Sequence, residues 1–182
     1  ACVACHHPAL GGGDNLALPI GVEADNPDLL GPGRTNNNAA HNSEGGPPVP
    51  RNAPTTFNVV AWDKFQFHDG RVESLDKTPG ANGAGKAGIR TPDSPLGEAD
   101  PLAGNNLVHA QARFPVTSNE EMKGFDHTQY TNQTIRELLA GRLGGYGNES
   151  DALINVDHWL EKFRVALSDA EGSAEELITE QN

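Results

Sequence analysis

The chain has 182 residues and a formal net charge of -12 at pH 7. So acidic a chain repels nucleic acid and anionic lipid, which excludes both as main partners. No apolar run approaches the 18 or so residues that a membrane span needs, so none is predicted. Hydrophobic residues make up only 36% of the chain, against 21 Gly and 13 Pro. This is a thin supply of core for one domain, which an apolar cofactor would supplement.

The first motif of the chain is Cys2-Val-Ala-Cys5-His6, and it contains both cysteines of the sequence. Two thiols at this spacing match the two vinyl groups of one haem, and the next histidine can ligate the iron. The alternatives are a redox dithiol and half of a zinc site. A zinc site needs further cysteines or well-spaced histidines, and a thioredoxin-like dithiol needs a strand-to-helix context. The motif therefore predicts one covalent haem c.

Long irregular segments follow this motif. Residues 7–55 and 76–106 are rich in Gly, Pro, Asn and Asp, a composition typical of loops that wrap a site. Between them, residues 55–62 predict a short helix or a turn. The sequence shows no evident strand and no internal repeat. We therefore expect an all-α, loop-rich cytochrome c domain with long Gly/Pro/Asn-rich insertions.

Helical patterns gather in the last third of the chain. Ser118 with Glu121 three residues later is typical of a capped helix start. Residues 131–143 predict a helix that ends at a Gly pair. Residues 155–167 predict an amphipathic helix, and residues 173–181 begin another. The apolar face of the amphipathic helix consists of Val156, Trp159, Leu160, Phe163 and Leu167.

Three further groups of residues could carry chemistry. In residues 51–55, Arg-Asn-Ala-Pro-Thr, the proline favours a shaped turn, with a solvated Arg51 as the plain alternative. Residues 67–71, Phe-His-Asp-Gly-Arg, gather an aromatic ring, a proton-handling group and an ion pair, or form a structural turn. The third group runs from Gln111 to Glu121. That glutamate is either a helix-cap contact or, above a haem face, an acid/base for peroxide.

In this order, the segments resemble the bacterial di-haem cytochrome c peroxidases and the methylamine-utilisation di-haem enzymes. The resemblance runs along the whole chain, with insertions around 22–50 and 76–106, and corresponds to the N-terminal, peroxidatic haem domain only. It implies that residues 1–182 are a single haem domain and a fragment of a longer protein with a second haem domain. The matching pieces are Cys2 to His6, residues 10–16, Ile20-Gly21, residues 51–55 with Asn58, residues 67–71, Pro115 and Glu121-Met122.

The resemblance implies a role for each matching residue. His6 would be the proximal iron ligand, Glu121 the distal acid/base, and Gln111 a residue of the same pocket. Asn52 would match a calcium ligand at the domain boundary, so calcium is a second candidate cofactor. The haem pocket would also include Arg51, His68 and Arg71.

Two positions depart from the family pattern. His68 stands where many relatives have a tryptophan assigned to electron transfer between the haems. The resemblance therefore does not predict the path of electrons between the haems in this chain. The removable sixth iron ligand matches His41 only loosely, because the loop that carries it is longer here. Met122 is an alternative iron ligand, as in many electron-transfer cytochromes. The remaining histidines have no motif around them and are expected at the surface or in packing roles.

The leading functional hypothesis is reduction of hydrogen peroxide, with electrons from a second haem domain or another chain of the same protein. A small cytochrome or cupredoxin would be the outer donor. Because c-type haem is attached outside the cytoplasm, a periplasmic or extracytoplasmic location is expected. The alternative is an electron-transfer cytochrome with a six-coordinate haem and no catalysis. An oxidase of another substrate would use the same pocket, and sequence does not separate it from a peroxidase.

Overall fold

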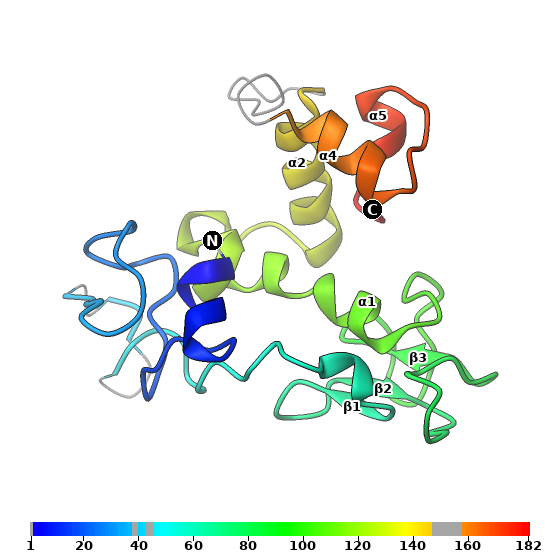
Figure 1. Cartoon of the computed structure of the whole chain (residues 1–182), viewed down its shortest axis with the longest axis horizontal. Coiled ribbons are helices and arrows are strands. Elements are labelled where there is room, and N and C mark those ends of the chain that lie inside the picture. Colours follow the sequence, from blue (N-terminus) through cyan, green and yellow to red (C-terminus); the bar gives the residue numbers. More distant parts are fainter. Residues whose placement is uncertain (1, 38–39, 43–45, 147–157) are drawn as a thin grey trace. The chain divides into compact units, whose positions relative to one another are not determined.

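The computed structural model describes residues 2–37, 40–42, 46–146 and 158–182 (Figure 1). The backbone divides into two compact units, residues 1–128 and residues 129–182, and each is described by itself. No helix among the described residues is long and apolar enough to cross a membrane. The single-domain expectation for residues 1–182 stays a prediction.

The first unit begins with two short 3-10 turns, Cys2–Ala4 and Pro8–Leu10. Gly11 follows with φ +70°, a left-handed conformation that glycine adopts at little cost. The chain then runs without regular structure to the 3-10 turn Val59–Ala61, within the residues described. Irregular backbone was predicted for this stretch, and a short helix or turn for residues 55–62. Both predictions are confirmed.

The first unit contains a three-stranded antiparallel sheet in the order β1-β2-β3, next to α1 (Figure 1). Its strands are β1 (Phe65–Gln66), β2 (Val72–Ser74) and β3 (Ile89–Arg90). Gln66 pairs with Val72, and Ser74 pairs with Ile89. Helix α1 (Leu107–Ala112) packs on β1 and β2 and begins at Asn106, whose side chain accepts from the backbone N–H groups of Val108 and His109.

One apolar core lies between this sheet and α1. It consists of Val72, Ile89, Ala103, Leu107, Ala110 and Phe114, all buried, with Phe67 packed against them. A buried ion pair borders it, in which an Arg113 guanidinium nitrogen lies 2.7 Å from an Asp100 carboxylate oxygen. The Thr91 hydroxyl donates to the same oxygen at 2.6 Å. The segment 76–106 therefore supplies core as well as loop.

The all-α expectation is wrong, because the first unit contains this sheet. Each strand has only two or three residues, so none is long enough to show an alternating pattern of apolar and polar side chains. Strand β3, which contributes the buried Ile89 to the core, lies within the Gly/Pro-rich segment that was expected to be a loop. The expectation of a loop-rich chain holds.

The first unit ends in a run of tight turns. A 3-10 turn at Pro115–Thr117 leads to a π-helix at Asn119–Lys123, then to a 3-10 turn at Phe125–His127. A capped α-helix was predicted to start at Ser118. Ser118 is at the N-cap, but its side chain makes no capping bond to the backbone. Its hydroxyl instead donates to the Glu120 carboxylate at 2.7 Å.

The second unit is helical in the part that the structure describes. Helix α2 (Asn132–Gly144) begins with a capping box between Thr131 and Thr134, and ends at Gly145 with φ +69°. This confirms the helix predicted over 131–143. Helix α4 (Trp159–Ala166) lies inside the predicted span 155–167, whose first three residues are outside the described residues. Helix α5 (Ala174–Leu177) starts after Ser173 as predicted and ends earlier than 181.

Candidate haem site

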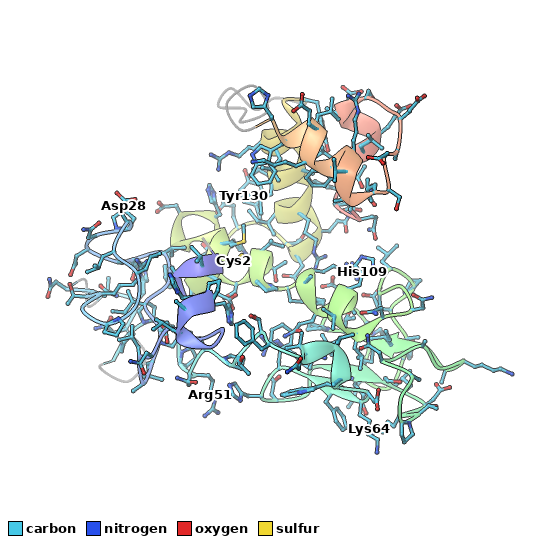
Figure 2. All side chains as sticks on the ribbon, viewed as in Figure 1. Cys2, Asp28, Arg51, Lys64, His109 and Tyr130 are labelled. Atoms are coloured by element: carbon cyan, nitrogen blue, oxygen red, sulfur yellow. The ribbon has the colours of Figure 1, made fainter. Side chains whose placement is uncertain are left out.

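The two cysteines and His6 occupy one tight turn at the start of the chain (Figure 2). The backbone N–H groups of Cys5 and His6 both donate to the Cys2 carbonyl, at 3.2 and 2.9 Å. Both thiols are free; Cys2 is exposed and Cys5 is half-buried. The turn thus presents two thiols and one imidazole within a few residues, as attachment to a single haem requires.

The environment of Cys5 argues against a redox dithiol. Burial raises the pKa of the Cys5 thiol to about 11, and the charge of Asp14 adds to this effect while Arg34 opposes it. A redox-active cysteine needs a thiol pKa lowered towards neutrality, because the thiolate is the reactive form. Nor does any group of three or more His, Cys, Asp or Glu side chains come together as a metal site within the described residues.

The ring of His6 is fixed through one nitrogen. Its Nδ1 lies 3.1 Å from the carbonyl oxygen of Gly12 and 3.0 Å from that of Pro54. Two carbonyl acceptors require that Nδ1 carry the proton, which leaves Nε2 of the neutral ring with its lone pair free. A backbone carbonyl that accepts from the other ring nitrogen is the usual support of a histidine metal ligand. The ring is therefore set up to ligate iron through Nε2.

A glycine turn brings the segment around Pro54 to His6. The Gly12 carbonyl accepts from the Thr56 N–H at 3.3 Å, and the Gly11 carbonyl accepts from the Thr55 hydroxyl at 2.5 Å. A Cβ on Gly12 would lie 2.9 Å from the Thr56 nitrogen, so a side chain there would push the two segments apart. The haem motif and the turn at 51–55 therefore form one site.

The turn at residues 67–71 joins the same site. His68 is exposed, and its Nε2 lies 3.1 Å from the Asn52 carbonyl oxygen. The Arg71 guanidinium lies 3.6 Å above the centre of the Phe67 ring and pairs with the Asp69 carboxylate at 3.2 Å. The cation is thus supported by a ring on one side and a carboxylate on the other.

Glu121 lies half-buried on the π-helix. Burial raises the pKa of its carboxyl, while the charge of Arg71 lowers it in part. The carboxyl of Glu121 therefore lies within electrostatic reach of Arg71 and of Cys5, whose pKa its charge raises. Sequence left open whether Glu121 is only a cap contact; the structure has no capping box at this helix.

The other candidate residues lie around this centre. Gln111 is half-buried near the end of α1, which packs on the turn that precedes the π-helix. Arg51 is exposed. The Asn52 amide nitrogen donates to the Leu16 carbonyl at 2.7 Å, and its role towards calcium stays a prediction. His41 Nδ1 lies 2.5 Å from a Glu23 carboxylate oxygen, and its ring stacks on Phe125 with the centroids 3.8 Å apart.

Two buried charged residues of the site were not predicted. Asp14 is 1% exposed and accepts from the Leu16 N–H at 3.1 Å. Arg34 is 7% exposed, and its guanidinium donates to five backbone carbonyls, those of Ile20, Gly21, Asn26, Pro27 and Leu29. No sequence signal marks such an arginine, because its acceptors are main-chain atoms with no residue preference.

A turn with two free thiols and a histidine held through Nδ1 defines a c-type cytochrome site. The family model for di-haem cytochrome c peroxidase matches residues 1–166, so the chain belongs to that family. Haem c is accordingly the cofactor of its family, as the first motif predicted. No curated protein and no solved structure that was compared matches the chain.

Proposed function

We propose that this chain is the peroxidatic haem domain of a di-haem peroxidase and reduces hydrogen peroxide. The observation that supports this most is the half-buried carboxyl of Glu121, which lies within electrostatic reach of Cys5 and of Arg71. A carboxylate near the haem is what peroxide chemistry needs and what simple electron transfer does not. Family membership supports a peroxidase or an electron-transfer haem domain.

The residues of the first motif would hold the haem. Cys2 and Cys5 would form the two thioether bonds, and His6 would ligate the iron through Nε2, since its Nδ1 is engaged by the carbonyls of Gly12 and Pro54. The haem, when bound, supplies the iron at which peroxide is reduced. The role of the glycine turn is to keep the imidazole at one angle, which sets the strength of the proximal bond.

Glu121 would move one proton. It takes the proton from the near oxygen of hydrogen peroxide and returns it to the far oxygen as the O–O bond breaks. Two electrons and two further protons complete the reduction to two waters. Gln111 would orient the peroxide by hydrogen bonding. Proton transfer of this kind is worth about 10² to 10⁴ in rate.

The carboxyl must be ionised to act as the base. Since burial raises the pKa of Glu121, its carboxyl becomes fully ionised only at a higher pH than that of an exposed glutamate. The nearby charge of Arg71 offsets part of this cost. Arg71 would therefore serve the reaction by keeping Glu121 ionised, in addition to its proposed place in the haem pocket with Arg51 and His68.

The electrons would come from a second haem domain or another chain of the same protein, with a small cytochrome or cupredoxin as outer donor. His41 is the proposed removable sixth ligand. Its contact with Phe125, two residues after the π-helix that carries Glu121, supports a place near the same haem face. We also propose a periplasmic or extracytoplasmic location, where c-type haem is attached.

A calcium ion near Asn52 is a further proposal and rests on the family resemblance. The amide oxygen of Asn52 would be one of the six to eight oxygens that calcium takes. Chelator treatment of the full-length protein should lower its activity, and calcium should restore it. A metal-free protein with full activity would exclude this site.

Ligand binding to the haem tests the proposed function. The full-length holo-protein, reduced by one electron per pair of haems, is mixed with cyanide and with hydrogen peroxide. A peroxidase binds cyanide at the iron and turns over peroxide. An electron-transfer cytochrome with a permanently six-coordinate haem does neither, and that result would overturn the proposal. A protein that binds cyanide but consumes peroxide only with an added organic substrate would indicate an oxidase.

A further inference from the structure

The loop of residues 20–34 lies against the π-helix that carries Glu121. The Val22 N–H donates to the Glu120 carbonyl at 3.1 Å. Gly21 is buried at this contact, and a Cβ built on it would overlap the Glu120 carbonyl oxygen. The backbone of Gly21 is not in the left-handed region, so glycine is needed here for space and not for its conformation. The loop and the π-helix therefore touch main chain to main chain.

Arg34 determines the shape of this loop. Its Nε donates to the Ile20 carbonyl at 2.8 Å, and its Nη2 donates to the Gly21 carbonyl at 2.9 Å. Its Nη1 donates to three carbonyls further along the loop, the nearest being that of Leu29 at 2.6 Å. A buried guanidinium that satisfies five carbonyls fixes both ends of the loop at once, because its fork is planar and rigid. Arg34 thus holds the carbonyls of Ile20 and Gly21, the two residues directly before Val22.

We propose that Arg34 and Gly21 are positioning residues for Glu121. The connection is a short chain of contacts: the guanidinium holds the Gly21 carbonyl, Val22 holds the Glu120 carbonyl, and Glu121 is the next residue. The inference rests on the proposed role of Glu121 and extends it to Gly21, which matches the family pattern, and to Arg34, which lies in a segment that the family resemblance treats as an insertion. Neither residue touches the peroxide; both act through the backbone of the π-helix.

The same loop approaches this part of the chain at a second point. Glu23 binds His41, and the His41 ring stacks on Phe125, just beyond the π-helix. The π-helix Asn119–Lys123 is a single turn, and its N-cap side chain makes no capping bond. A lone turn without a cap has little stability of its own, so its position depends on what packs against it.

Three variants of the full-length holo-protein test the proposal. Gly21→Ala adds one methyl group against Glu120. Arg34→Lys keeps the positive charge near Cys5 but loses the fork that binds five carbonyls. Gly172→Ala is the matched control: its backbone is also outside the left-handed region, and the nearest atoms to its Cβ would be side-chain atoms of Leu177 and Glu176, at 3.1 to 3.2 Å. Glu121→Gln is measured in parallel.

The first two variants should lower kcat for peroxide by about 10- to 100-fold with little change in KM, because a small displacement of the base is enough for such a loss. They should slow the association of cyanide, which binds as HCN and must give up a proton. Amide exchange should increase more at residues 119–123 than in β1, β2, β3 and α1, while the Soret band stays close to that of the parent. The melting temperature of Arg34→Lys should fall, because buried carbonyls lose their donor. Gly172→Ala should match the parent throughout.

The outcomes separate the two proposals. Gly21→Ala and Arg34→Lys variants with parent-like kcat and parent-like exchange at 119–123, beside an impaired Glu121→Gln variant, would overturn the positioning role alone. Losses that follow the melting temperature, with no specific change at 119–123, would also overturn it. If Glu121→Gln turns over normally, the proposed role of Glu121 falls, and increased exchange at 119–123 would still support the contact itself.

Discussion

Two regions of the first unit are built on different principles. The haem-side region, residues 2–56 and 115–127, is held by turns, glycines and bonds to backbone carbonyls. The sheet region, residues 65–114, has a continuous core of buried apolar side chains. In the described part of residues 2–56 the buried apolar side chains are mostly small, namely Ala4, Pro19, Ile20, Pro48 and Ala53, while Val3, Leu10, Val22, Leu29 and Leu30 are at least 36% exposed.

The difference shows where each region obtains its stability. The sheet region buries enough apolar surface to hold itself together, at roughly 25 cal/mol for each Å² removed from water. The haem-side region relies on hydrogen bonds, whose net contribution is about 1 kcal/mol each because water competes for the same groups. A haem offers it a large apolar surface and two covalent links. The haem-side region should therefore depend on its cofactor, and the sheet region should not.

Removal of the haem is the most drastic way to test this comparison. In the Cys2→Ser/Cys5→Ser double variant, the polypeptide should carry no Soret absorbance after denaturation, and its mass should fall by one haem per motif. Hydrogen exchange should show residues 2–56 unprotected, while β1, β2, β3 and α1 stay protected. Equal loss of protection in both regions would mean that the haem-side region does not depend on its cofactor more than the sheet region does.

Asp100→Ala should destabilise the sheet region and leave the haem-side region unchanged. It leaves the buried Arg113 without its closest partner, a loss typically worth about 3 to 5 kcal/mol. The free energy of unfolding of the sheet region should fall by about this much, with the haem spectrum unchanged. Glu98→Ala, on the same segment and exposed, is the control. If Asp100→Ala and Glu98→Ala have equal effects on the unfolding transition, the ion pair does not stabilise the sheet region.

The pH dependence of this stability follows from the pKa of Asp100. Burial raises this pKa, but hydrogen bonds from Thr91 and the Leu102 N–H, together with the Arg113 guanidinium, lower it by more, so that the net direction is down. The contribution of Asp100 is complete above the pKa of an unfolded aspartate and is lost as the pH falls through the lowered value. Acid unfolding of the parent should thus be steeper than that of the Asp100→Ala variant.

Glu121→Gln addresses the haem-side region. Peroxide turnover should fall by at least about 10²-fold, since the amide keeps the shape of the side chain and cannot take a proton. Because the pKa of Glu121 is raised in the folded protein, its contribution to stability is present below the pKa of an unfolded glutamate and lost as the pH rises. At neutral pH the variant should therefore be no less stable. A loss of stability without a catalytic defect would return Glu121 to a structural role.

The smallest expected effect concerns Arg71→Gln. The charge of Arg71 lowers the raised pKa of Glu121, so its removal should move the acid limb of the kcat/KM profile to higher pH. Turnover well above that limb should change little. Lys64→Gln, an exposed cation outside the haem-side region, serves as the control. An acid limb that does not move in the Arg71→Gln variant would mean that Arg71 does not influence the base.

Sequence predicted the parts of this chain that have a local signature. The Cys2 to His6 motif indicates its chemistry by spacing alone, and the helix predicted over 131–143, with the Gly pair that ends it, matches α2 almost to the residue. The strands were not predicted, because two or three residues cannot show an alternation of apolar and polar side chains. The capped helix expected at Ser118 is a π-helix, whose bond pattern leaves no distinct spacing of apolar residues.

The unpredicted part of the site depends on contacts to main-chain atoms. Nothing in the sequence around Arg34 says that its five acceptors are carbonyls, or that Val22 will meet Glu120. The same holds for His6, whose Nδ1 partners are the carbonyls of Gly12 and Pro54. Such contacts depend on the path of the backbone in space, so they appear only with the structure.

The turn between β1 and β2 is constrained from both sides. The register Gln66 to Val72 fixes its ends, and the contact of His68 with the Asn52 carbonyl fixes its tip. One residue added there would shift the register of the hairpin or move Arg71 away from Phe67. Relatives of this chain should therefore vary in length within residues 76–88, where turns follow one another, and keep residues 67–71 at constant length.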